Sequence, residues 1–290
     1  MQLSVAAPTR SALRLGFSDH AVPFYEECVT GYRWPLPAPD ASVVLLHGLQ
    51  SHAGWFFETG DELVDRGLAV TALDRRGSGS SPGARGDVAR WQDWVDEVAV
   101  AVRLARGAHP EVPVHLVGHC FGANVGLAYA LRDEPGIASL TMLTPGLHVL
   151  PDYTPGEKLR ILAAGLTRPQ ARFRVPQNDE LFTRDRAVLA WIRADRLGAR
   201  TLTARALLQI GGMVRMLRAR IGELELPLLV LEASRDRIAD NLRNRALLER
   251  ELGGRYSSAC FEAEHFLLAE PCREAVLDEL VRFTTNEEGL

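Results

Sequence analysis

The chain has 290 residues, 47% hydrophobic and 24% charged, which is the composition of a soluble globular protein with one large core, or a core plus a lid. Its formal net charge of -4 gives no electrostatic basis for binding nucleic acid. No run of about 18 apolar residues occurs, so no transmembrane segment is expected, and residues 1–14 lack the apolar stretch of a signal peptide. The four cysteines are Cys28, Cys120, Cys260 and Cys272. Because they form no CxxC pair and no metal-ligand spacing, we expect a reduced, cytoplasmic setting and no metal site.

In chain order, the first half alternates strand-like and helix-like patterns. Short mixed segments within residues 12–34 indicate one or two antiparallel edge strands. Residues 42–46 form a continuous apolar run ended by His47 and Gly48, which is typical of a strand buried on both faces of a parallel sheet. The patterns that follow predict a helix at 53–66, a strand at 68–74, a helix at 91–106, a strand and helix around 114–124, and a strand at 137–144.

This βαβαβαβ alternation predicts a doubly wound, mostly parallel sheet with helices on both faces. Residues 145–223 interrupt it, because they contain arginine-rich helical patterns and no strand-like run. The sheet pattern then resumes, with a strand at 227–231, a helix at 240–252, a strand at 255–261 and a final helix at 271–284. We therefore expect a core made of residues 1–145 and 224–290, with a helical cap or lid inserted at 146–223.

The strand and helix around residues 114–124 meet in the sequence Gly118-His119-Cys120-Phe121-Gly122. This G-x-C-x-G spacing is that of the nucleophile elbow G-x-S-x-G, with sulfur in place of oxygen. A sharp strand-to-helix turn strains the nucleophile's backbone, and a side chain two residues away on either side would collide with neighbouring backbone. The helix dipole also favours a negatively charged sulfur. Taken alone, the pattern is equally compatible with a buried structural cysteine.

Residues that could complete such a site follow the later strands, because ligands of parallel sheets bind beyond the carboxyl ends of the strands. His265 lies between the last predicted strand and the last helix, where a general base belongs. Three acidic residues follow the strand that ends at Leu231: Glu232, Asp236 and Asp240. Asp236 is favoured because it lies in a turn, whereas Asp240 is better placed to cap the next helix and Glu232 lies nearer the strand.

These motifs resemble the α/β-hydrolase superfamily and, within it, the branch of monoacylglycerol lipases and lysophospholipases, the serine aminopeptidase S33-type hydrolases. The resemblance extends from about residue 40 over almost the whole chain and implies an α/β-hydrolase fold with a helical lid insertion. It rests on the segments Leu46–His52, Leu73–Ser81, Gly118–Gly122, Thr183–Asp185, Ser234–Ile238 and Ala263–Phe266.

Carried over residue by residue, the resemblance implies that Cys120 is the nucleophile, Asp236 the acid and His265 the base. The backbone amides of Leu49 and Phe121 take the positions of the oxyanion hole. The branch normally has serine where Cys120 stands, although cysteine nucleophiles occur elsewhere in the superfamily, in dienelactone hydrolases, polyhydroxyalkanoate synthases and some thioesterases.

A Cys-His-Asp triad predicts an acyl ester or thioester hydrolase that forms a covalent acyl-thioenzyme, without a cofactor. Because thiolates exchange acyl groups readily with thioesters, a lidded site that excludes water could also transfer the acyl group to another acceptor. Two alternatives remain open: a non-catalytic small-molecule-binding protein, and a lipase-like carboxylesterase for monoacylglycerol or lysophospholipid. The residues expected to line the pocket, unless the aromatic ones serve only core packing, are His52, Phe173, Phe182 and Trp191.

The lid segment at residues 151–220 is strongly cationic. This indicates either a solvated helical face or a docking surface for an acidic partner, such as an acyl carrier protein. The candidate contacts are Arg168, Arg172, Arg174, Arg184 and Arg186.

Overall fold

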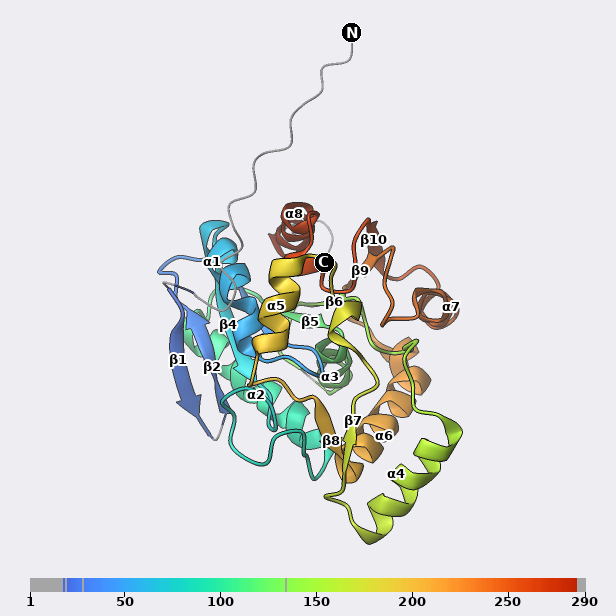
Figure 1. Cartoon of the computed structure of the whole chain (residues 1–290). Coiled ribbons are helices and arrows are strands. Elements are labelled where there is room, and N and C mark those ends of the chain that lie inside the picture. The colour runs from blue at the N-terminus through green and yellow to red at the C-terminus, as the bar shows by residue number, and fades with distance from the viewer. Residues whose placement is uncertain (1–17, 19, 28, 134, 286–290) are drawn as a thin grey trace.

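A computed structural model describes residues 18, 20–27, 29–133 and 135–285. In this part of the chain, an eight-stranded sheet has the order β1-β2-β4-β3-β5-β6-β9-β10 (Figure 1). The predictions made for residues 1–14, for strand residues before 18 and for Cys28 lie outside the described residues. The strands of this sheet are β1 Val22–Glu26, β2 Val29–Trp34, β3 Ala41–Leu46, β4 Leu68–Asp74, β5 Val114–His119, β6 Ser139–Leu143, β9 Leu228–Ala233 and β10 Ser257–Phe261.

The pairing of these strands confirms a mostly parallel sheet with an antiparallel edge. From β4 to β10 along the sheet, each strand runs parallel to its neighbour. The hairpin of β1 and β2 pairs antiparallel with β4 and forms the edge predicted within residues 12–34. All parallel carboxyl ends therefore face one side of the molecule, where a ligand site is expected.

Helices cover both faces of the sheet, as the continuous apolar strands predict. In β3, Val44 and Leu46 pack with one helical layer, whereas Val43 and Leu45 pack with the other, because successive side chains of a strand point to opposite faces. The first layer holds α2 (Trp91–Ala108), α3 (Phe121–Ala130) and α7 (Asn241–Leu252). The second layer holds the 3-10 turn η1 (Ala53–Phe56), the helix α1 that follows it (Phe57–Asp65), the 3-10 turn η4 (Leu267–Ala269) and α8 (Arg273–Thr285).

The segment at residues 146–223, which we call the insertion, joins β6 to β9 and is mainly helical. Its elements are α4 (Pro155–Thr167), β7 (Arg172–Arg174), η2 (Asp179–Leu181), α5 (Arg186–Ala194), β8 (Thr201–Thr203), α6 (Ala204–Arg220) and η3 (Ile221–Glu223). The expectation of no strand here is wrong, because β7 and β8 form an antiparallel pair. Strands of three residues are too short to show an alternating pattern, and their partners lie far apart in the sequence.

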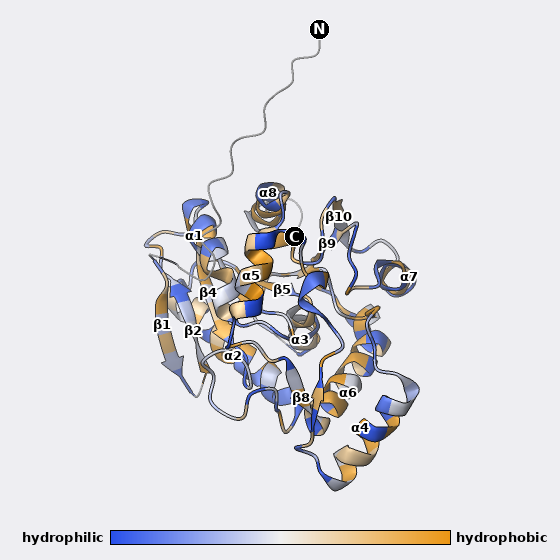
Figure 2. Ribbon diagram, in the orientation of Figure 1, coloured by the Kyte–Doolittle hydropathy of each residue, from blue (hydrophilic) through white to orange (hydrophobic). Residues whose placement is uncertain are grey.

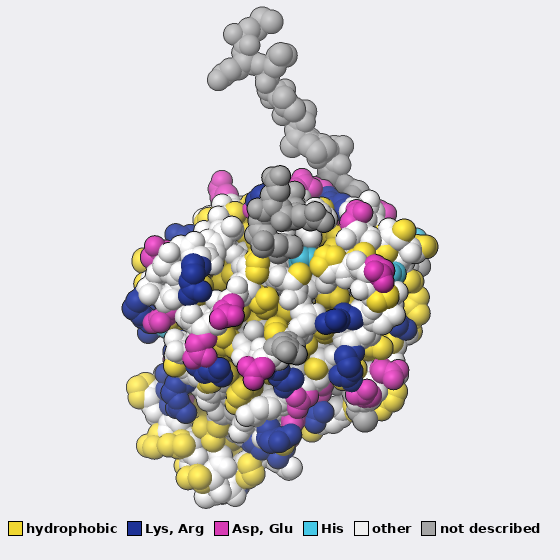
Figure 3. Space-filling view, turned by 180° about the vertical axis from the view of Figure 1, so that it is seen from behind, with side chains coloured by type: hydrophobic (Ala, Val, Ile, Leu, Met, Phe, Trp, Pro, Cys, Tyr) yellow, Lys and Arg dark blue, Asp and Glu magenta, His cyan; other side chains and the backbone are white. Residues whose placement is uncertain are grey.

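Helix α4 of the insertion exposes apolar side chains. Leu159, Leu162 and Leu166 are 68%, 50% and 81% exposed, although Ile161 of the same helix is buried. Figure 2 shows hydrophobic and hydrophilic residues together on α4. From behind, hydrophobic side chains gather over this end of the molecule (Figure 3). The insertion therefore presents an apolar surface to solvent.

Candidate active site

Cys120 lies in the sharp turn between β5 and α3, with φ 54° and ψ -111°. A positive φ is strained for a residue other than glycine. A Cβ atom on Gly122 would lie 2.0 Å from the carbonyl oxygen of Leu46, and one on Gly118 would lie 2.5 Å from the backbone of Ala123. The steric reason for glycine at both positions is therefore confirmed.

Hydrogen bonds hold this turn against the neighbouring strand. The backbone N–H of Cys120 donates to the carbonyl oxygen of Leu143 at 2.9 Å, and the Cys120 carbonyl accepts from Gly146 at 3.2 Å. The cysteine is 3% exposed. Its sulfur is thus carried by a fixed backbone at the N-terminus of α3, where the helix dipole favours negative charge.

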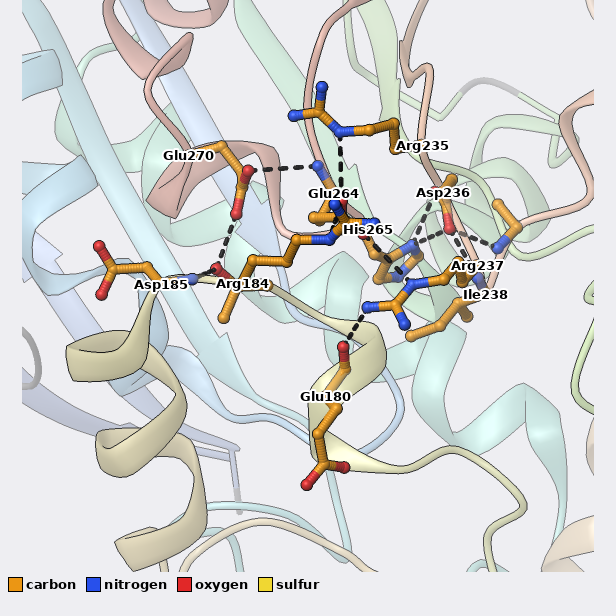
Figure 4. A network of polar contacts seen from close by, with 12 residues as sticks. Glu180, Arg184, Asp185, Arg235, Asp236, Arg237, Ile238, Glu264, His265 and Glu270 are labelled. Carbon is orange, nitrogen blue, oxygen red and sulfur yellow. Dashed lines mark hydrogen bonds and ion pairs between the residues drawn. The ribbon is translucent and has the colours of Figure 1, made fainter.

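His265 and Asp236 form a buried pair beside this turn (Figure 4). Nδ1 of His265 lies 2.8 Å from Oδ2 and 2.9 Å from Oδ1 of Asp236. Oδ1 also accepts the backbone N–H groups of Ile238 at 2.7 Å and Ala239 at 2.8 Å. Burial raises the pKa of Asp236, but attraction to His265 and these hydrogen bonds outweigh it and lower the pKa below its usual value.

The other two acidic candidates have different partners. Glu232 forms an ion pair with Arg245, with Nε 2.6 Å from Oε2. Asp240 caps α7 by accepting the backbone N–H of Arg243 at 3.1 Å. Among the described residues, Asp236 is therefore the acid that contacts His265.

His265 carries a positive charge at neutral pH. Burial lowers its pKa, but attraction to Asp236 and to Cys120 outweighs burial and raises the pKa to about 10. Nε2 is buried and makes no hydrogen bond of normal geometry within the described residues. The neighbouring His119 ring, 5.1 Å away, stays neutral, because burial and repulsion by His265 lower its pKa to about 3.

The loop after β3 passes over Cys120. A Cβ atom on Gly48 would lie 3.5 Å from the Cβ atom of Cys120. Leu49 follows directly, and Phe121 is the first residue of α3, so both candidate oxyanion donors belong to segments that border the cysteine.

One buried cation beside this loop was missed by the sequence analysis. Arg75 is 4% exposed and donates to the carbonyl oxygens of His47 at 2.7 Å and Gly48 at 2.9 Å. The next residue, Arg76, turns the other way and pairs with Glu97 at 2.7 Å. Two adjacent arginines after a strand give no local signal of which one is buried.

A cavity of about 320 Å³ reaches Leu49 and extends between α4 and α6. Its lining is largely apolar, with Asp152, Lys158 and Gln177 as polar groups. The apolar lining includes Val149, Ile161, Val175, Leu207, Leu208 and Ile210.

The four predicted pocket residues do not line this cavity. Phe182 is buried with its ring centroid 5.6 Å from that of His265, and Phe173 belongs to β7. His52 lies 3.3 Å from Asp195, and both line a different cavity of about 340 Å³ together with Trp191. The wall of the cavity beside Leu49 is formed instead by side chains of α4 and α6, which are distant from Leu49 in sequence. A substrate contact for the four predicted residues stays a prediction.

The five candidate docking arginines are spread over several elements. Arg184 forms an ion pair with Glu264, with Nε 2.9 Å from Oε1. Arg172, on β7, donates to the carbonyl oxygen of Arg85 at 2.8 Å. The remaining three, Arg168, Arg174 and Arg186, are exposed.

Within the described residues, no helix is both long and apolar enough to span a bilayer.

The strand order, the elbow after β5 and the acid–histidine pair after β9 and β10 together define an α/β-hydrolase fold. A solved monoglyceride lipase variant from Saccharomyces cerevisiae has this fold, with a TM-score of 0.80 at 15% identity, covering 96% of this chain and 98% of that one. Residues 37–271 match the family described as serine aminopeptidase, S33, and the chain belongs to that family.

Two lipases are among the relatives of this chain. The monoacylglycerol lipase of Mycolicibacterium smegmatis is 28% identical over 256 residues, covering 86% of this chain and 89% of the lipase. The mouse monoglyceride lipase is 28% identical over 226 residues, covering 75% of this chain and 72% of the relative.

Proposed function

We propose that this protein is an ester hydrolase in which Cys120 is the nucleophile, His265 the acid–base group and Asp236 the residue that orients the histidine. The observation that carries the proposal is the 2.8 Å contact between His265 and Asp236, buried beside a strained cysteine elbow. A pKa of about 10 for His265 supports a resting imidazolium beside Cys120.

In the first half of the proposed reaction, the thiolate of Cys120 attacks the ester carbonyl and a carbon–sulfur bond forms. The carbonyl π electrons become a negative oxygen, which the N–H groups of Leu49 and Phe121 stabilise by about 3 kcal/mol each. When this intermediate collapses, the carbon–oxygen bond breaks and the departing alcohol takes the proton from Nε2 of His265.

In the second half, neutral His265 accepts a proton from water as the water attacks the thioester. Collapse of the second tetrahedral intermediate releases the carboxylic acid and restores the thiolate, while His265 keeps the proton. Asp236 stays ionised throughout and holds Nδ1 of His265, so that Nε2 faces the reacting atoms. A thioester substrate, or an acceptor other than water, would use the same intermediate.

The proposed substrate is a lipid ester such as a monoacylglycerol or a lysophospholipid. The names of the two relatives support this class. The cavity beside Leu49 offers apolar walls for an acyl chain, and its polar members Asp152, Lys158 and Gln177 suit a hydroxyl-bearing head group. The exposed leucines of α4 suit a lid that meets a lipid surface. Docking of an acyl carrier protein stays a prediction.

The test is turnover of a monoacylglycerol, p-nitrophenyl acyl esters and acyl thioesters, with intact-protein mass spectrometry. Wild type should release the alcohol in a burst and carry one acyl group on Cys120. Cys120→Ala should lose at least about 1,000-fold in kcat, whereas the exposed control Cys260→Ala should keep wild-type turnover. Turnover retained by Cys120→Ala would contradict the proposal. No turnover in wild type, together with slow iodoacetamide labelling of Cys120, would favour the non-catalytic binding protein.

A further inference from the structure

The buried guanidinium of Arg75 has no role in the proposed reaction, yet it is attached to the loop that precedes Leu49. Nη1 donates to the carbonyl oxygen of His47 at 2.7 Å and Nη2 to that of Gly48 at 2.9 Å. The two hydrogen bonds from one planar group fix two successive peptides of this loop.

The carbonyl of Gly48 belongs to the same peptide unit as the N–H of Leu49. This carbonyl accepts a second hydrogen bond, from Nδ1 of His47 at 2.8 Å. Nδ1 must carry the proton, because Nε2 of His47 accepts the backbone N–H of Arg75 at 3.0 Å. Hydrogen bonds accepted by a carbonyl polarise its peptide and make the N–H of that peptide a stronger donor.

Arg75 also contacts the segment that carries the second candidate donor. Its guanidinium carbon lies 4.9 Å from the ring centroid of Phe121 and 5.6 Å from that of Trp94. Contacts of this kind between a buried cation and an aromatic face are attractive. The Arg75 side chain therefore contacts both the peptide that carries the Leu49 N–H and the ring of Phe121, the two residues whose amides would bind the oxyanion.

The charge of Arg75 persists despite its burial. Desolvation lowers its pKa to about 10, and attraction to Glu97, Cys120 and Asp74 opposes that decrease. At neutral pH the side chain is thus a buried cation, and a fixed charge that is buried acts strongly on nearby developing charge.

We propose that Arg75 is a positioning residue for the oxyanion hole: it orients and polarises the Gly48–Leu49 peptide and holds Phe121, so that both amides point at the oxygen that becomes negative. The inference rests on the proposed function. It predicts that Arg75 acts on the transition state and hardly on the bound substrate, because the charge on the oxygen exists only after attack.

The experiment compares Arg75→Met and Arg75→Lys with the control Arg76→Met, which removes the neighbouring arginine and its ion pair with Glu97. kcat and KM are measured with a soluble ester. Affinity is measured for a trifluoromethyl ketone, whose carbonyl becomes a negative oxygen when the thiolate adds, and for the matching alcohol, which stays neutral.

Arg75→Met should lower kcat and the affinity for the ketone at least about tenfold, a part of the 100- to 1,000-fold loss seen when a whole oxyanion donor is removed. KM and the affinity for the alcohol should change less than about threefold. Arg75→Lys keeps the charge but cannot donate to two carbonyls in one plane. Its kcat and its affinity for the ketone should lie between those of wild type and Arg75→Met. Arg76→Met should leave kcat and the ratio of the two affinities unchanged.

The inference is overturned if Arg75→Met keeps kcat within about tenfold of wild type, or if it weakens ketone and alcohol binding equally. If Arg75→Met does not fold, Arg75→Lys is tested in its place by the ratio of the affinities for ketone and alcohol. An unchanged ratio for Arg75→Lys would then overturn the inference. A wild-type protein that neither turns over esters nor forms the ketone adduct would instead overturn the proposed function.

Discussion

Arg184 of the insertion forms an ion pair with Glu264, the residue directly before His265 (Figure 4). The same carboxylate lies 3.2 Å from Nε of Arg235 and 3.3 Å from Nε of Arg237, the two neighbours of the acid that contacts His265. The side chain of Glu264 is 1% exposed, whereas those of the three arginines are 68%, 40% and 42% exposed. One buried carboxylate thus joins the insertion to both loops of the candidate site.

Removing the shared carboxylate should cost more stability than removing one of its partners. Arg184→Gln should change the free energy of unfolding by less than about 1 kcal/mol, because Arg184 is largely hydrated and Glu264 keeps two other arginines. Glu264→Gln should cost about 1–3 kcal/mol, since three guanidinium groups lose the negative charge that they share and an amide NH2 replaces one of its two acceptor oxygens. Urea unfolding at pH 7 measures both, and equal costs for the two variants would contradict the shared role of Glu264.

The elbow glycines make a second prediction about stability. Gly122→Ala should destabilise the fold by more than about 3 kcal/mol, because the new Cβ atom would lie 2.0 Å from the carbonyl oxygen of Leu46 and backbone cannot move aside easily. Gly212→Ala in α6 is the control: apart from its own stretch of α6, no heavy atom of the described residues lies within 4 Å of its Cβ position, so it should stabilise the helix by up to about 1 kcal/mol. Thermal unfolding measures both, and a near-neutral Gly122→Ala would show that the elbow can relax.

The raised pKa of His265 predicts how the contribution of the pair to stability depends on pH. The folded-state pKa is about 10 and the ordinary value is 6.5, so the stabilisation is complete below 6.5 and is lost as the pH rises through 10. Asp236 has a lowered pKa and stays ionised throughout this window. Asp236→Asn should therefore destabilise most near pH 6 and least above pH 10.

Urea unfolding of wild type and Asp236→Asn across that pH range checks this expectation. In a Cys120→Ala background the loss should begin at lower pH, because the imidazolium then lacks one of the two groups that raise its pKa. A difference in stability that does not change with pH would mean that His265 is neutral in the folded protein.

The cavity beside Leu49 predicts acyl-chain selectivity. Leu208 lines this cavity, and Leu208→Trp should lower kcat/KM for long-chain monoacylglycerols at least about tenfold while butyryl esters keep their rate, since even one misfitting methylene costs about 1–3 kcal/mol. Leu242→Trp, on α7 and 72% exposed, is the matched control. Equal losses for long and short esters would place the acyl chain elsewhere.

Much of the fold could be predicted because it follows from local patterns. The apolar run of β3 predicts a strand covered on both faces, and side chains of β3 pack against helices on both. The helix expected at 53–66 is present as η1 and α1, which end before Gly67, a glycine with φ 88°. The pairing of β7 with β8 was missed, because it joins three-residue segments whose only signal is their contact with each other.

By itself, the sequence determined the elbow, because the requirement for glycine at 118 and 122 comes from backbone within a few residues and from the strand expected beside it. Only the tertiary structure showed that Asp236 contacts His265, that Arg75 is the arginine buried beside the loop before Leu49, and that α4 and α6 line the cavity. Each of these depends on where side chains from distant segments meet. The contacts agree with the sequence in favouring Asp236, because Glu232 lies within β9 and pairs with Arg245, and Asp240 caps α7.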